Sequence, residues 1–277
     1  MEFRARDHRL RAIALGTAAL LLLGGRAQAQ NAGQLRPLCA DRPGKATPPC
    51  ILDAGHVQLE VGLVDFSETN DAGDRDRTFA IGGFELRAGL TRRSEVEVDW
   101  TPLILDRNRQ AGATTRTSGV GDLMLGFRTA LTDPDTQGVM VSVEPFVTAP
   151  TATHGLGAGG WTGGVIMPVQ APLPDQLSLT FTPQLASARN ADGHGDHAAA
   201  SAAAALSRPF GPTTLGAELW GLVDDDPQGR TYEASFDLTC AWTPAAAPDL
   251  QLDGGVNAGL NRRTPDVEAY VGVSRRF

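Results

Sequence analysis

The sequence lacks most of the features that mark soluble enzymes and helical membrane proteins. None of its 277 residues belong to an apolar run of about 18 or more, so a chain that crosses a membrane as helices is excluded. Lysine is nearly absent, with Lys45 the only example, and the formal net charge of -8 argues against a nucleic-acid partner. No serine nucleophile elbow, phosphate-binding loop, dinucleotide fingerprint or zinc-type cysteine pair occurs, which favours a protein that is not an enzyme and holds no cofactor or metal.

The first residues have the three parts of a secretory signal peptide. Arginines at positions 4, 6, 9 and 11 precede an apolar run over 12–23, and the small-residue site Ala27-Gln28-Ala29 follows. The apolar run is too short to span a bilayer as a helix. We therefore expect residues 1–29 to be removed and the mature chain to enter an oxidising compartment.

The three cysteines are unevenly placed. Cys39 and Cys50 lie in a proline-rich stretch without strand or helix periodicity, and in an exported chain their spacing favours a local disulfide over two free thiols. This disulfide is expected in an N-terminal periplasmic segment over residues 30–54. Cys240 falls at strand spacing between Leu238 and Trp242, so it is expected to stay unpaired as a small hydrophobic residue.

From residue 55 to residue 277 the chain repeats one pattern, in which apolar and polar residues alternate. In the first run Val57, Leu59 and Val61 alternate with polar neighbours, and twelve such runs can be distinguished. Many last for about 8–12 residues, which suits a tilted membrane strand better than the usual soluble strand. The run over 198–206 is nearly all alanine, and both a strand and a short helix remain open there. The alternation alone also fits a soluble sandwich.

The connections separate these two folds better. Short turns at 91–93, 132–135, 172–175, 209–212 and 244–248 alternate with longer polar stretches at 68–77, 106–116, 190–197 and 224–230. This is typical of a barrel with short periplasmic turns and longer outer loops. The predicted fold is therefore all-β: a transmembrane up-and-down antiparallel β-barrel of about 12 strands over residues 55–277, in the outer membrane.

The last strand ends at Phe277, with Val271 and Val273 behind it on the same face. A final strand that ends in phenylalanine resembles the signal that outer-membrane proteins present to the barrel assembly machinery. The other expected partners of the protein are the lipid bilayer and lipopolysaccharide. Asp224-Asp225-Asp226 is a candidate for divalent ions that bridge lipopolysaccharide, but a polar turn before Pro227 explains the same residues and is favoured.

Strand parity places an unusual number of charged residues on the inner face of such a barrel. Acidic groups in this number need water, cations or arginine partners to stay ionised. Two interpretations are open: an ion-paired network that fills a narrow barrel, and a pore that favours cations or neutral solutes. The lumen-lining candidates are Glu60, Glu85, Arg87, Glu97, Asp99, Asp122, Arg128, Glu144, Glu218, Glu233, Asp237 and Asp253, and the same parity places Glu95, Asp266, Glu268 and Arg276 inward.

Three blocks of the chain carry a family resemblance. They are Asp41-Arg42-Pro43 with residues 55–60, the central stretch over 119–123, and the C-terminal stretch over 249–277. The chain resembles the outer-membrane transporter proteins grouped as meta-pathway phenol-degradation proteins. The resemblance implies an outer-membrane barrel and uptake of small organic molecules, including aromatic ones. A passive channel for such solutes is the first hypothesis, and a structural or surface-interaction barrel without conductance is the alternative. An enzyme of the outer membrane is disfavoured.

Overall fold

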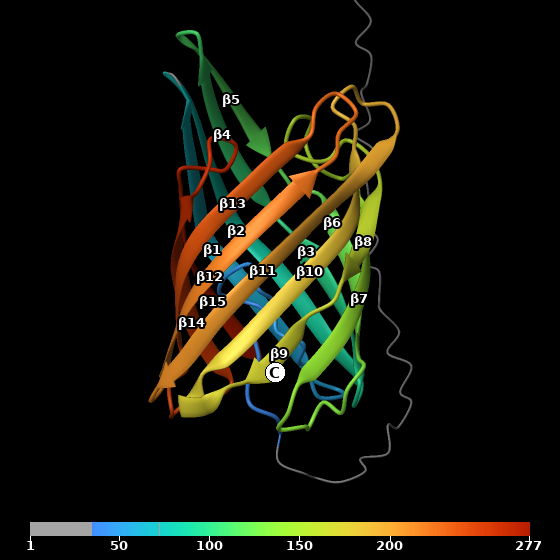
Figure 1. Cartoon of the computed structure of the whole chain (residues 1–277), viewed down its shortest axis with the longest axis vertical. Helices are drawn as coiled ribbons and strands as arrows, with labels where there is room; N and C mark the ends of the chain where they lie inside the picture. Colours follow the sequence, from blue (N-terminus) through green and yellow to red (C-terminus); the bar gives the residue numbers. More distant parts are fainter. Residues whose placement is uncertain (1–34, 72) are drawn as a thin grey trace, which may run out of the picture. The chain divides into compact units, whose positions relative to one another are not determined.

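The computed structural model describes residues 35–71 and 73–277. The predicted signal peptide at 1–29 lies outside the described residues. The described residues form one compact unit, in which a single antiparallel sheet closes on itself (Figure 1). Nowhere in the described ranges is there a helix long and apolar enough to cross a membrane.

Twelve barrel strands are built from fifteen shorter segments. Three barrel strands are each made of two consecutive segments (β3 with β4, β5 with β6, and β8 with β9), because each of these pairs continues along the same part of the wall. The predicted fold class is confirmed. The segments are β1 Val57–Asp71, β2 Asp74–Thr91, β3 Ser94–Trp100, β4 Leu103–Gln110, β5 Ala113–Gly119, β6 Leu123–Ala130, β7 Met140–Ala149, β8 Thr162–Ile166, β9 Val169–Pro172, β10 Ser178–Arg189, β11 Asp196–Phe210, β12 Thr213–Asp224, β13 Thr231–Trp242, β14 Leu250–Gly259 and β15 Val267–Arg276.

The barrel closes where the first strand meets the last. β1 pairs with β15 on one side and β2 on the other, and Val57 and Phe277 exchange backbone hydrogen bonds of 3.2 and 2.7 Å at the seam. Closure leaves no open sheet edge along this seam, as a strand in lipid requires.

Burial is inverted relative to a water-soluble protein. Large apolar side chains such as Leu125, Leu219 and Leu238 are exposed on the outer face, whereas the alternating polar residues are buried inside. This inversion follows from the two-residue period, because each strand turns one face to lipid and the other to the interior.

The alanine-rich run is a strand. Residues 198–206 lie within β11, and each pairs with a residue of β10 across an unbroken register. Alanine favours a helix in isolation, but the ladders to β10 and β12 supply all the backbone partners that the segment needs.

Two of the predicted polar loops are strands in the structure, so these two predictions are wrong. β1 runs to Asp71 and β2 starts at Asp74, so the stretch over 68–77 is mostly paired strand rather than loop. The stretch over 106–116 is likewise β4 and β5, joined by a tight turn in which Ala111 and Gly112 have positive φ values of 48° and 84°. These strand ends carry polar residues on both faces, so the apolar alternation that marks a membrane strand stops before the strand does.

Candidate functional site

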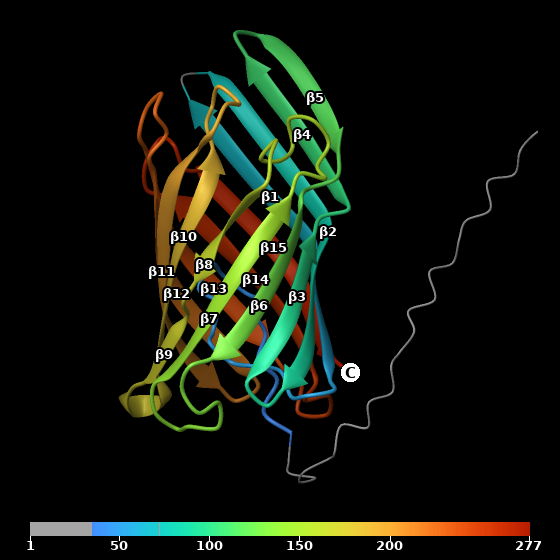
Figure 2. The same ribbon diagram turned by 90° about the vertical axis from the view of Figure 1, so that its right-hand side faces the viewer.

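Residues 36–52 enter the interior of the barrel, and we call them the plug (Figures 1 and 2). They belong to the N-terminal segment predicted over residues 30–54, and they contact the inner wall of the barrel. Their partners lie on β1, β2, β3, β6, β10 and β12 to β15. Ala40, Ala46, Ile51 and Leu52 are among the most buried apolar residues of the described chain. The plug therefore supplies most of the buried apolar side chains inside the described barrel.

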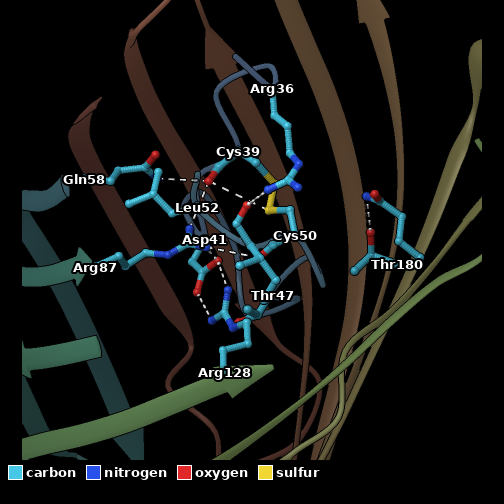
Figure 3. The surroundings of a disulfide bond; sticks show 12 residues. Arg36, Cys39, Asp41, Thr47, Cys50, Leu52, Gln58, Arg87, Arg128 and Thr180 are labelled. Atoms are coloured by element: carbon cyan, nitrogen blue, oxygen red, sulfur yellow. Dashed lines mark hydrogen bonds and ion pairs between the residues drawn. A yellow bond between two sulfur atoms is a disulfide. The ribbon is translucent and has the colours of Figure 1, made fainter. Parts of the chain in front are cut away.

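The predicted disulfide joins Cys39 and Cys50 within the plug, and Cys240 is free (Figure 3). The Arg87 guanidinium on β2 donates to the carbonyls of both cysteines, at 2.9 Å for Cys39 and 3.2 Å for Cys50. Gln58 on β1 also donates to the Cys39 carbonyl at 2.9 Å. The wall thus holds both ends of the disulfide-closed loop.

Three wall glutamates bind the plug backbone. Glu60 accepts the N–H groups of Asp41 and Arg42, each at 3.0 Å, and Glu218 accepts those of Lys45 and Ala46 at 2.8 and 2.7 Å. On β3, Glu95 accepts the N–H of Leu52 at 2.6 Å. These carboxylates satisfy plug donors that have no ladder partner, and charged acceptors make stronger bonds than neutral ones.

Asp41 is the centre of the first ion cluster. Its carboxylate lies between Arg87, 3.2 Å away, and Arg128, which binds both of its oxygens (Figure 3). Both arginines are about 1% exposed. Burial acts to raise the pKa of Asp41, but the charges of Arg128 and Arg87 outweigh it and hold that pKa below its ordinary value.

Wall carboxylates complete this first cluster. Arg128 also pairs with Glu144 at 2.9 Å and Glu97 at 3.1 Å, while Arg87 pairs with Glu95 at 2.7 Å. Asp41, Glu85 and Glu97 bring one oxygen each within 4.8 Å of one another, the spacing that a metal ion would need. The two guanidiniums already lie against these carboxylates, so the cluster has a source of positive charge without a metal.

Arg42 and Lys45 form a second cluster across the barrel. Arg42 pairs with Asp253 at 3.1 Å and stacks over the ring of Tyr270, with 5.4 Å to the ring centre. Lys45 pairs with Glu268 at 2.7 Å and lies 3.7 Å from the fully buried Asp237. The only lysine of the chain is therefore placed where two strands, β13 and β15, present carboxylates to its ammonium group.

The remaining predicted residues have different surroundings. Asp99 is half-buried beside Glu85, its cross-strand neighbour, and Glu233 is half-buried on β13. Asp122 lies apart from both clusters, where it accepts the N–H groups of Ala152 and Ala158 at 2.8 Å each and fixes the loop that follows β7. Phe277 is exposed at the barrel seam.

The two larger of the cavities that border the plug lie on different sides of it. The first, of about 300 Å³, is lined by Arg42 and Lys45 from the plug and by Asp65, Asn257 and Tyr270 from the wall. The second, of about 220 Å³, lies between residues 38–48 of the plug and strands β10 to β14. The interior is thus divided by the plug but not filled by it.

Sequence reasoning missed the plug residues themselves. Asp41 and Arg42 belong to a family-like block, and Lys45 stands out as the only lysine, yet no spacing identifies their partners. Arg42 and Asp253 are 211 positions apart in the chain, and Lys45 and Glu268 are 223 apart. Such pairs become visible only when the barrel is closed.

Comparison with known proteins identifies one family and several solved structures of similar fold. The family model described as "Putative MetA-pathway of phenol degradation" matches residues 40–277. An outer membrane channel from Pseudomonas putida F1 has 17% identity and a TM-score of 0.68, covering 85% of this chain and 99% of that one. The β domain of the Bordetella autotransporter BrkA has 11% identity and a TM-score of 0.50, covering 81% of this chain and 100% of that one. No curated protein matches.

Proposed function

The chain belongs to this phenol-degradation family, and from that premise we propose that it is a passive outer-membrane channel for small organic solutes, restricted by its own plug. A closed barrel with an apolar outside and a polar inside is the architecture of outer-membrane channels. The fold that it shares with the Pseudomonas putida channel supports this proposal. We further propose that Phe277 acts in assembly, since it closes the seam between the first and last strands.

One observation carries the proposal. Within the described chain, each hydrogen bond from residues 36–52 to the wall has a side chain as donor or acceptor, and none joins backbone to backbone. A segment bound in this way is not a strand of the wall, and its removal would break no hydrogen bond of the barrel ladders. We infer that the plug sets how far the lumen opens.

The solute is proposed to be small. The cavity of about 300 Å³ beside Arg42 and Lys45 is at the lower limit of known ligand sites, which span about 300–1,000 Å³. Tyr270 offers one aromatic ring there, and Asp65 and Asn257 offer polar groups. Such a lining suits a molecule with one ring and a few polar substituents, in agreement with the family's association with phenol.

The buried ion clusters also favour a second candidate, a structural barrel that does not conduct. Two fully buried arginines with carboxylates on each side hold the plug firmly. Planar-bilayer recordings of the full chain and of a variant without residues 36–52 separate the two candidates. We expect rare or small conductance steps from the full chain and large, steady steps from the deletion variant.

Folding of the deletion variant is checked first: a folded barrel should migrate differently in an SDS gel before and after boiling. A correctly folded variant that remains silent at high protein load would reject the channel and support the structural barrel. Liposome swelling with phenol-sized and disaccharide-sized solutes then tests the proposed size limit, because only the smaller solutes are expected to enter through the full chain.

A further inference from the structure

Beyond the apolar zone, β1, β2, β4 and β5 continue as a four-stranded sheet at the end of the barrel opposite the C-terminus (Figure 2). Arginines face one another across this sheet. Arg75 is opposite Arg109, Arg77 is opposite Arg107, and Arg107 is opposite Arg116. All five therefore lie on one face, which we call the arginine face.

Contacts inside the barrel show that the arginine face points outward. Asp65 is an inward residue because it pairs with Arg42 of the plug, and its neighbour on β2 is Ala80. Since successive residues of a strand alternate, Phe79, Arg77 and Arg75 point away from the lumen. The acidic residues of these strands, Asp76 and Asp106, fall on the opposite, inner face.

The arginine face is poorly neutralised. Glu68 pairs with both Arg75 and Arg77 at 2.6 Å. Among the described residues no carboxylate lies within ion-pair distance of Arg107, Arg109 or Arg116, and all three are exposed. Like charges directly opposite on a sheet are destabilising, so five arginines against one glutamate make a surface that an anion would stabilise.

The position of the arginine face identifies the anion. Arg77 and Arg107 are two residues beyond Phe79 and Leu105, which are 39% and 40% exposed on the lipid-facing side. Two residues of strand measure about 7 Å, so the arginines begin where the apolar zone ends. This is the depth of lipid headgroups, and guanidinium groups bind phosphate with paired hydrogen bonds.

We propose that the arginine face binds the phosphorylated headgroup of lipopolysaccharide in the outer leaflet. The site is independent of conduction and of the plug. The acidic turn at 224–226 is not the point of contact, because its carboxylates have partners of their own, as the favoured polar-turn explanation requires. Asp224 bonds to His197 at 2.7 Å and Asp225 to Arg230 at 2.8 Å.

The test compares two double variants of the full chain in detergent. R107Q/R116Q removes two arginines from the face, and R262Q/R263Q removes two exposed arginines from the loop between β14 and β15. That loop is at the same end of the barrel, since Asp266 bonds to the Asn70 N–H at 2.6 Å. Binding of purified lipopolysaccharide is measured by surface plasmon resonance, with retained heat-modifiable migration as the check on folding.

We expect R107Q/R116Q to weaken binding about 30-fold and R262Q/R263Q to leave it within about twofold of the wild type. Enzymatic removal of the lipid phosphates should weaken wild-type binding to the same extent. Equal affinities of the two folded variants would overturn the proposal. Full displacement by millimolar inorganic phosphate would overturn it too, because the face would then be a site for the free anion.

Discussion

Replacing Asp41 with asparagine tests whether the first ion cluster keeps the plug in place. The substitution preserves the size of the side chain but removes the negative charge that lies between Arg87 and Arg128. Breaking one member of a buried ion pair costs about 3–5 kcal/mol. We expect the lower limit, about 3 kcal/mol, because Arg128 keeps Glu144 at 2.9 Å and Glu97 at 3.1 Å.

A loss of about 3 kcal/mol of plug binding raises the ratio of released to seated plug about 100-fold. Open probability in planar bilayers should rise by the same factor while the released state remains the minor one. Hydrogen exchange of peptides that cover residues 38–50 should accelerate correspondingly, and this readout does not depend on conductance. Asp175→Asn is the matched control, since Asp175 is an exposed turn residue without a charged partner in the described chain.

The same reasoning fixes the sign of the pH dependence. Asp41 has a lowered pKa in the folded protein, so its contribution is complete at neutral pH and is lost only as the pH falls through that lowered value. The asparagine variant should therefore differ from the wild type at pH 7. An open probability and an exchange rate that both match the control, in a variant that folds, would refute this role of Asp41.

Four further outcomes are expected. If the channel conducts, a salt gradient should give a reversal potential of cation-selective sign. Replacing Glu97 with glutamine and Asp99 with asparagine should reduce this cation selectivity. Anion selectivity in the wild type would contradict the inward assignment of the carboxylates. The effect should weaken in 1 M salt, where charges are screened within about 3 Å. Deletion of Phe277 should lower the amount of folded barrel in the outer membrane several-fold, as measured by membrane fractionation against a variant with a neutral surface substitution. An unchanged amount would contradict a role of Phe277 in assembly. Peptide mapping without reduction should recover Cys39 joined to Cys50 and no bridge from Cys240. The purified protein should migrate differently before and after boiling in SDS, because barrel hydrogen bonds persist until heated, and identical migration would count against the barrel.

Much of the barrel could be predicted from the sequence, because the relevant signal is local. An apolar residue at every second position reports which face of a strand meets lipid, whatever the strand is paired with. The inward side of Glu60, Arg87 and Glu218 follows from the same period. The disulfide was predictable for a similar reason, since Cys39 and Cys50 are separated by only 11 positions.

The strand ends were less predictable. Past the lipid zone both faces of a strand meet water, so Arg75 and Arg107 carry no periodic signal even though their backbones remain paired. The alanine-rich part of β11 lacked a signal for another reason, because alanine is small enough for either face and its own preference is helical. In both places the neighbouring strands decided the structure.

The position of the plug inside the barrel is determined by tertiary structure alone. Its sequence shows a disulfide and a few charges, and these fit a loop outside the barrel as well as a segment inside it. What places it inside is the simultaneous presence of Glu60, Glu95 and Glu218 around one lumen, each positioned to accept backbone N–H groups. These glutamates come from distant strands, so they meet only when the barrel closes. The alternation thus determines that a polar lumen exists, and only the closed barrel determines what occupies it.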